Sequence, residues 1–296
     1  MFKKLFGLMA IGCVLLFTGC LDYGRQTLTY RYDVKSDTLR IFQVYQGIFG
    51  EDQQVGLSAK ELDQLQSVLS GQRTFFFANW ILEYDRDQMR KGLENLNKPD
   101  ASHDPAMRAR QETFFKLLLD NVRVENGAFY LDGHGKLCGT QLVTVSRFSS
   151  LVAAANVEIR DLLKLEATQE KVSAEEREIY LKFAEQPQPC IIMEGNQLRL
   201  RIPMTRASFE KSYGPKTNSA KQQDEFKQQG GKIAFADNEM KWSIGTPSDQ
   251  VTALTLPVSE KPYIANALEA VKSRAVVHEK MDIIAATKAF MGATGK

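Results

Sequence analysis

A strand-turn-strand pattern recurs along this chain and constrains its fold more than any other feature. Apolar residues alternate over 27–34 and again over 39–45, with a short polar turn at 35–37 between them. Three later segments, 122–131, 191–200 and 233–242, each place a two-residue turn of Asn, Gly or Asp type between two β-prone runs. Alternation with a period of two indicates a half-buried strand, and such turn residues favour a hairpin. The sequence therefore predicts four hairpins.

Amphipathic helices are expected between these hairpins. Asp104 and Pro105 form a typical helix start, and Ser173 with Glu176 forms a capping box. Apolar residues at helical spacing then predict helices over 58–71, 105–118, 151–163, 173–186 and 264–275. Because hairpin-paired strands alternate with helices in groups, the sequence predicts an α+β fold whose antiparallel sheet is built from hairpins.

Two prolines, Pro187 and Pro189, mark the best place to divide the chain. A cut there would give two lobes, 27–186 and 190–296. One continuous domain is the alternative, because a chain of 296 residues is compatible with either arrangement.

The first twenty residues have the order of a secretory signal. Lys3 and Lys4 precede an apolar run from Leu5 to Phe17, and Thr18, Gly19 and Cys20 follow it. The run is too short to span a bilayer, which takes about 20 residues. With a cysteine directly after a small glycine, the segment resembles a bacterial lipoprotein signal. That resemblance implies cleavage of residues 1–19, lipidation of Cys20, a short tether over 20–26 and a periplasm-facing body over 27–296.

The resemblance also implies a location in the cell envelope, with the lipid bilayer as a partner through acylated Cys20. The next residue is Leu21, whereas an aspartate there marks retention in the inner membrane of well-studied lipoproteins. We therefore expect the periplasmic face of the outer membrane. An ordinary signal peptide and an uncleaved anchor are the alternatives.

Charge argues against a nucleic-acid partner. The chain has 38 Lys and Arg against 36 Asp and Glu, and Lys3 and Lys4 fall in the leader, so the remainder carries no formal net charge. Binding to phosphate backbones or to anionic headgroups needs a surplus of basic residues. Arg199, Arg201 and Arg206 form only a local basic strip, typical of the solvated face of an edge strand.

Two cysteines, Cys138 and Cys190, remain once Cys13 is lost with the leader and Cys20 is lipidated. An exported protein lies where disulfides persist, so a bridge between them is one prediction. The alternative is a pair of buried thiols that act as small apolar side chains.

Candidate chemistry in the sequence is sparse. Glu83, Asp85 and Asp87 are spaced by two, so on a strand they would share a face and could hold Ca²⁺ or act as acid and base. If a helix starts near Asp85, they are instead its cap and first-turn charges. The turn over 132–138 brings His134 close to Cys138 in sequence, an arrangement that could serve a hydrolase if the thiol pKa were lowered.

No common signature for a serine nucleophile, a phosphate loop or a metal site occurs, so we expect no cofactor and no metal. The sequence favours a non-catalytic interaction or assembly protein with an envelope protein as partner, and the apolar tail residues Ile283, Ile284, Phe290 and Met291 could form its contact site or dock on the body. The alternatives are a carrier of an apolar ligand such as a lipid and a hydrolase that uses the 132–138 turn. An internal apolar cavity would favour the carrier, an exposed apolar patch the interaction protein, and a cleft around His134 and Cys138 the enzyme.

Overall fold

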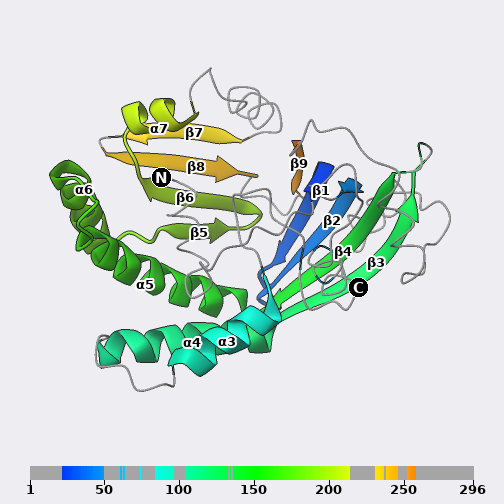
Figure 1. Cartoon of the computed structure of the whole chain (residues 1–296), viewed down its shortest axis with the longest axis horizontal. Helices are drawn as coiled ribbons and strands as arrows, with labels where there is room; N and C mark the ends of the chain where they lie inside the picture. The colour runs from blue at the N-terminus through cyan, green and yellow to red at the C-terminus, as the bar shows by residue number, and fades with distance from the viewer. Residues whose placement is uncertain are drawn as a thin grey trace.

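The computed structural model describes residues 22–49, 61, 63, 74, 84–96, 104–132, 134, 136–213, 231–236, 238–245 and 252–257. These residues form two antiparallel sheets together with helices, most of which lie beneath the sheets in Figure 1, and this confirms the predicted α+β class. Several predicted segments lie outside the described residues: the expected leader with Cys20, the helices expected over 58–71 and 264–275, and the tail with Ile283, Ile284, Phe290 and Met291. Two isolated positions in the first of these helices, 61 and 63, are described.

The first sheet has five strands in the order β3-β4-β2-β1-β9. The hairpin predicted at the N-terminal end of the body is present, because β1 (Asp22–Asp33) pairs with β2 (Thr38–Phe49) across the expected turn. The other strands are β3 (Val122–Leu131), β4 (Leu137–Ser146) and β9 (Thr252–Pro257). Neighbouring strands run antiparallel throughout this sheet.

The hairpin predicted within 122–131 is wrong, because this whole segment is the single strand β3. Asn126 and Gly127, which looked like a turn, lie at a bulge where β3 gains one residue over β4. A Cβ atom at Gly127 would lie 2.1 Å from the Thr140 hydroxyl, so glycine is needed for the close approach of the two strands. The chain turns later, where the Asp132 carboxylate accepts hydrogen bonds from the N–H groups of His134 and Lys136.

The second sheet has four strands in the order β5-β6-β8-β7 and consists of two hairpins. The hairpin predicted over 191–200 is formed by β5 (Ile191–Glu194) and β6 (Gln197–Pro203), with Gly195 at a φ of 54° in its turn. The hairpin predicted over 233–242 is formed by β7 (Lys232–Ala236) and β8 (Glu239–Ile244). Both predictions are confirmed.

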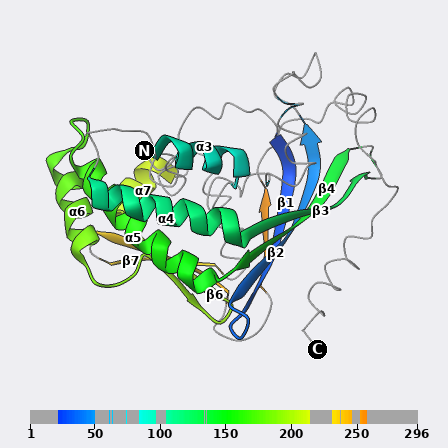
Figure 2. The same cartoon turned by 90° about the horizontal axis from the view of Figure 1, so that it is seen from below.

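The helices are α3 (Arg86–Leu96), α4 (Pro105–Asn121), α5 (Phe148–Ala167), α6 (Ala174–Glu185) and α7 (Arg206–Tyr213). The first four pack side by side in chain order (Figure 2). Asp104 caps α4 with Pro105 in its first turn, and the Ser173–Glu176 capping box starts α6, as predicted. None of the described helices is long and apolar enough to cross a membrane.

The first sheet contains strands from both sides of residues 186–190. Strand β9 returns to the first sheet and pairs with β1, although the residues just after 190 build the second sheet. A division into 27–186 and 190–296 would therefore separate β9 from its partner β1. Figure 1 shows helix α5 beside both sheets. Side chains of the two sheets and of α5 line one apolar region, where the candidate site lies.

Candidate functional site: an apolar cavity between the sheets

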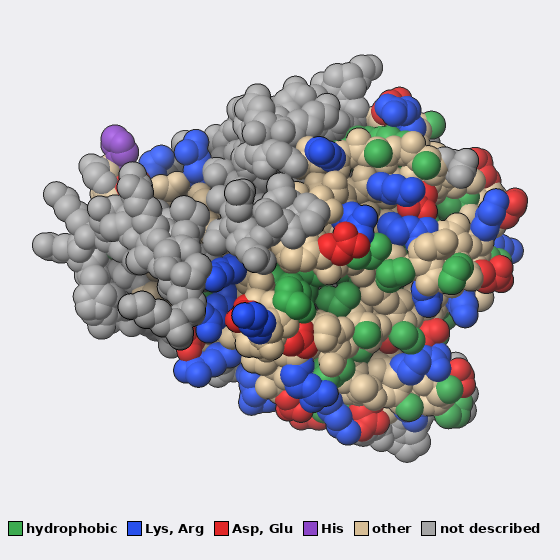
Figure 3. Space-filling model, turned by 180° about the vertical axis from the view of Figure 1, so that it is seen from behind, with side chains coloured by type: hydrophobic (Ala, Val, Ile, Leu, Met, Phe, Trp, Pro, Cys, Tyr) green, Lys and Arg blue, Asp and Glu red, His purple; other side chains and the backbone are tan. Residues whose placement is uncertain are grey.

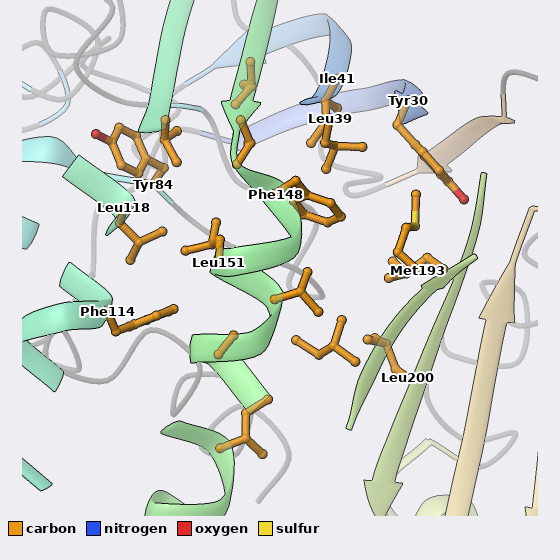
Figure 4. A pocket seen from close by; sticks show the side chains of 18 of the residues that line it. Tyr30, Leu39, Ile41, Tyr84, Phe114, Leu118, Phe148, Leu151, Met193 and Leu200 are labelled. Atoms are coloured by element: carbon orange, nitrogen blue, oxygen red, sulfur yellow. The ribbon is translucent and has the colours of Figure 1, made fainter. Parts of the chain in front are cut away.

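A partly enclosed cavity of about 180 Å³ lies between the two sheets, along helix α5. Both sheets and helices α4 and α5 contribute to its wall, which is almost entirely apolar. Figure 4 shows Leu118 and Phe114 on one side of α5, Met193 and Leu200 on the other, and Leu39 and Ile41 of the first sheet above it. The cavity is therefore built from segments that are far apart in the sequence.

Alternation along the strands explains why the sheets present apolar side chains to this cavity. Leu28 and Tyr30 of β1 lie on the same face as their neighbours on β2 and β4, because the strand register places these positions opposite one another. The residues of the first sheet that line the cavity are Leu28, Tyr30, Leu39, Ile41, Val122, Val143 and Val145. The second sheet contributes Ile191, Met193, Leu198, Leu200 and Ile244.

The same face of the first sheet becomes polar beyond the cavity. The Gln26 amide donates to Gln43 at 2.9 Å, and the Tyr45 hydroxyl donates to Gln43 and lies 3.2 Å from Gln141. Gln141 in turn donates to Asn126 at 2.8 Å, so buried amides connect β1, β2, β4 and β3. Such a network favours one strand register, because a shifted register would break these hydrogen bonds between buried groups. It also limits the apolar surface to the end of the sheet near α5.

Helix α5 forms the floor of the cavity through a stripe at helical spacing. Leu151, Ala155, Glu158 and Leu162 recur at intervals of three or four, and all four line the cavity together with Phe148, Val152 and Ile159. The neighbouring helix α4 adds Phe114 and Leu118. Among the described residues that line the cavity, Glu158 is the only one with a carboxylate.

Two buried asparagines hold the walls together. The Asn156 side chain on α5 accepts from the N–H of Ile191 at 2.7 Å and donates to its carbonyl at 2.9 Å, so it fixes β5 to the helix. Asn196, in the β5-β6 turn, accepts from the N–H of Tyr32 at 2.7 Å. The Tyr30 hydroxyl lies 2.9 Å from the Asn196 carbonyl and thus adds a second link between the sheets. The spacing of the sheets is therefore set by specific hydrogen bonds.

Glu158 is the most unusual side chain at the site. It is 5% exposed, and neither of its carboxylate oxygens has a hydrogen-bond partner. Burial raises the pKa of Glu158 to about 7. The nearby Gln111 side chain and the positive charge of Arg110 partly offset this rise in pKa, and the negative charge of Asp161 adds to it. Asp161 itself pairs with Arg110 at 2.6 Å.

The acidic residues singled out in the sequence have a local role. The Asp85 carboxylate accepts from the Gln88 N–H at 3.0 Å and so caps α3, and Asp87 in the first turn pairs with Arg90 at 3.3 Å. These contacts match the alternative in which a helix starts near Asp85. Glu83 lies outside the described residues. Among the described residues, no group of three or more potential ligands could hold a metal ion.

The turn at 132–138 does not bring His134 and Cys138 into a common cleft among the described residues. His134 is exposed, whereas Cys138 is fully buried and its thiol lies 3.5 Å from the Lys136 carbonyl. Burial raises the pKa of Cys138, although a nucleophilic thiol needs a lowered one. These observations give no support to a hydrolase at this turn.

The predicted bridge between Cys138 and Cys190 is not formed in this structure, where both residues are free and buried thiols. Cys138 belongs to β4, at the end of the first sheet opposite the β2 bulge. Cys190 packs instead with Tyr180 and Phe183 of α6. Their separate positions in the core correspond to the alternative of two buried thiols.

The basic strip of Arg199, Arg201 and Arg206 does not lie on the edge strand that the sequence suggests. Arg199 and Arg201 belong to β6, which is an inner strand of the second sheet. Arg201 forms a buried ion pair with Glu239, with the closest atoms 2.6 Å apart, and its guanidinium lies over the Phe183 ring. Arg199 pairs with Glu194, and Arg206 lies 3.8 Å from Glu210. The three arginines thus have separate partners.

Exposed apolar side chains are few among the described residues. The large ones are Val34 in the β1-β2 turn, Val157 and Leu165 on α5, and Leu181 on α6. On the face shown in Figure 3, apolar side chains are interspersed with charged ones. Isolated apolar residues are common on protein surfaces. The interaction surface expected from the sequence therefore stays a prediction.

Sequence reasoning missed Glu158 and the cavity, although a signal for Glu158 was available. It occupies a position in the stripe formed by Leu151, Ala155 and Leu162, where an apolar side chain is expected. A carboxylate within an apolar helical stripe is costly to bury and indicates a special role. Comparison with known proteins adds no assignment, since no family model, no curated protein and no solved structure matches this chain.

Proposed function

We propose that this protein binds a small apolar molecule in the cavity between its two sheets and is held at the cell envelope by lipidated Cys20. The observation that carries the proposal is the apolar cavity of about 180 Å³. Of the three functions that the sequence left open, the carrier of an apolar ligand is the one that such a cavity favours. An interaction or assembly role with an envelope protein has no specific observation of this strength behind it.

The energetic cost of an empty cavity supports this proposal. Protein interiors are normally packed with few voids larger than a water molecule. At about 24 cal/mol per Å³, leaving 180 Å³ empty costs about 4 kcal/mol. Water gives little relief, because almost no polar group faces the cavity and a bound water needs polar partners. An apolar ligand would remove most of this cost.

The volume of the cavity indicates the size of the ligand. A cavity of about 150 Å³ lined by apolar side chains binds benzene. A cavity of about 180 Å³ therefore suits a single substituted ring or a short acyl chain of similar bulk. A longer lipid would be bound through one part of its chain only.

Anchoring by lipid fits this function. A body attached to the outer membrane through Cys20 would remain close to the bilayer, where apolar molecules accumulate. One acyl chain gives only marginal membrane binding, whereas the two or more chains of a processed lipoprotein hold a protein stably. The membrane location is itself an expectation from the resemblance of residues 1–20 to a lipoprotein signal.

A matched pair of substitutions on α5 tests the proposal. Ala155 lines the cavity, and Ala153 is exposed on the same helix. Toluene and indole should raise the melting temperature of the purified wild-type protein and should bind in a calorimetric titration. Ala155→Leu should weaken this binding by filling the cavity, whereas Ala153→Leu should leave it unchanged. Equal binding by the two variants, or no binding of any apolar probe to the wild-type protein, would contradict the proposal.

A further inference from the structure

We propose that Glu158 is a proton-controlled switch for the cavity: its protonated carboxyl keeps α4 packed against α5 and the apolar ligand enclosed, and loss of the proton separates the two helices and releases the ligand. The inference rests on the proposed function and deepens it, because it names how binding at the same site is regulated. It requires no contact between the ligand and the carboxyl group.

The carboxyl group of Glu158 is buried beside α4, on the helix that forms the cavity floor. The residue is 5% exposed, and both of its side-chain oxygens are buried without a hydrogen-bond partner. Its neighbour Gln111 on α4 is also buried. An unpaired charge is far more costly to bury than a neutral polar group. The packed arrangement of α4 and α5 therefore suits the protonated form of Glu158 and opposes the ionised form.

The two helices beside this carboxyl group also form part of the cavity wall. Phe114 and Leu118 of α4 line the cavity together with Leu151 and Leu162 of α5. Figure 4 shows Phe114 and Leu118 on one side of Leu151. Separation of α4 from α5 would therefore expose one side of the apolar wall to water. A ligand held by apolar contacts loses affinity when its wall becomes hydrated.

The attachments of the helices indicate which part moves. Asn156 fixes α5 to β5 through both backbone groups of Ile191. Helix α4 runs directly into β3 at Val122, so its C-terminal end is fixed to the first sheet. Its N-terminal half is linked to α5 by the ion pair of Arg110 with Asp161, at 2.6 Å. We therefore expect the N-terminal half of α4 to move away from α5 when Glu158 ionises.

The groups around Glu158 determine the pH at which the switch acts. Burial raises the pKa of Glu158 to about 7, the charge of Asp161 raises it further, and the charge of Arg110 lowers it. Arg110 is already paired with Asp161, so an ionised Glu158 must share this arginine or obtain water. Tyr30 and Tyr84 are the other titratable side chains among the described lining residues, and phenols are neutral near pH 7. The ligand is therefore retained below about pH 7 and released above it.

Toluene tests the switch because it has no titratable group. Calorimetric titration of wild-type protein should show binding about tenfold weaker at pH 8 than at pH 6, because only about a tenth of Glu158 stays protonated at pH 8 and the apparent affinity falls with the competent fraction. By linkage, toluene binding near pH 7 should take up a fraction of a proton. Titrations in two buffers with different ionisation enthalpies measure this uptake.

Two substitutions on α5 identify the titrating group. Glu158→Gln keeps an uncharged side chain of nearly the same shape, so it should bind toluene equally at pH 6 and pH 8 and take up no proton. Glu166→Gln is the matched control, since Glu166 lies on α5 outside the residues that line the cavity, and it should keep the pH dependence of the wild type. Hydrogen exchange, corrected for its intrinsic pH dependence, should show lower protection of residues 105–114 at pH 8 in wild type and not in Glu158→Gln.

The outcomes separate this inference from the proposed function. If wild-type protein binds toluene equally at pH 6 and pH 8, or if the pH dependence survives in Glu158→Gln, the switch is overturned and the apolar site stands. Unchanged protection of α4 between the two pH values would also overturn it. If toluene binds at neither pH, the proposed function fails and the switch fails with it. Proton uptake by the wild type needs no variant, so this measurement decides the question even if Glu158→Gln does not fold.

Discussion

Asp37 caps helix α5 across the fold through Ser149. Its carboxylate oxygens accept from the Ser149 N–H at 2.9 Å and from the Ser149 hydroxyl at 2.7 Å, and its backbone carbonyl accepts from the Phe148 N–H. The residue before the helix, Arg147, makes no side-chain cap of its own. The turn of the first hairpin therefore supplies the N-terminal cap of the helix that forms the cavity floor.

Removal of this cap should loosen α5. Burial raises the pKa of Asp37, but the hydrogen bonds from Ser149 and from the Tyr32 hydroxyl, together with the charge of Arg147, hold the pKa below its ordinary value. Asp37→Ala should lower the free energy of unfolding by about 1–2 kcal/mol, because capping side chains contribute that much. It also puts alanine at a φ of 49°, which adds strain.

Asp37→Asn separates these two effects. Asparagine tolerates a left-handed backbone and can still accept from the Ser149 N–H, so it should lose much less stability than alanine. Urea denaturation of both variants makes the comparison. Equal losses for asparagine and alanine would mean that neither the backbone strain nor a neutral acceptor matters, and the cap would then depend on the charge alone.

The ion pair of Arg201 with Glu239 is expected to be the most sensitive charged contact among the described residues. Both side chains are only 12% exposed, and two guanidinium nitrogens contact the carboxylate. Arg201→Ala leaves the buried Glu239 with Lys241, 3.9 Å away, as its remaining cationic neighbour among the described residues, and should cost about 3 kcal/mol in unfolding free energy. Arg201→Lys should recover only part of this, because lysine lacks the planar fork.

An exposed pair serves as the control for this measurement. Arg90 and Asp87 lie 3.3 Å apart with about half of each side chain in solvent. Arg90→Ala should change the unfolding free energy by less than about 1 kcal/mol, as is usual for surface ion pairs. A similar cost for Arg90→Ala and Arg201→Ala would contradict the view that burial makes the Arg201 pair important.

Local sequence signals were sufficient to predict those hairpins and helix starts whose structure depends on residues within one short segment. The hairpins of β1 with β2, β5 with β6 and β7 with β8 combine alternation with turn residues, and the start of α6 has its complete capping box. The bulge at Gly127 was misread as a turn because its cause is the approach of Thr140 on another strand. Long-range packing of this kind leaves no local signature.

The candidate site was harder to foresee for the same reason. Its wall combines side chains from both sheets and from α4 and α5, so only the tertiary arrangement creates the cavity. The polar clusters that attracted attention in the sequence, around Asp85 and around His134, turned out to be a helix cap and a tight turn. Turns and caps use the same residue types as catalytic sites, so local composition does not separate them.

The two thiols should resist labelling in the folded protein. Burial raises the pKa of Cys190 to about 11 and also raises that of Cys138, so little thiolate forms near neutral pH. Iodoacetamide at pH 8 should therefore leave both residues unmodified in native protein and should label both after denaturation without reductant. Mass spectrometry counts the labels on the mature chain. Absence of both labels in denatured, unreduced protein would instead show a bridge between Cys138 and Cys190.

The proposed lipidation of Cys20 predicts how the protein fractionates. Cys20→Ala should either release the body from the membrane or leave an unprocessed precursor, because the acyl chains provide most of the membrane affinity. Immunoblots of membrane and soluble fractions, with the size of the band, decide between these results and normal processing. A Cys20→Ala protein of normal mature size that remains in the membrane fraction would exclude the lipid anchor.

The titration of Glu158 predicts a loss of stability as pH rises. Its pKa in the folded protein is about 7, above the ordinary value of 4.5, so between these values the folded state binds more protons than the unfolded state. Stability is then full below about pH 4.5 and falls as pH rises through about 7, by about 3 kcal/mol at most. The charged neighbours act in opposite directions, since Asp161 raises the pKa of Glu158 and Arg110 lowers it.

Glu158→Gln removes this titration with almost no change in shape. The variant should be as stable as wild type near pH 5 and more stable near pH 8, with a flatter dependence of unfolding free energy on pH between the two. Urea unfolding at intervals of half a pH unit measures both curves. Parallel curves for wild type and Glu158→Gln would show that this carboxyl titrates as it does in the unfolded chain.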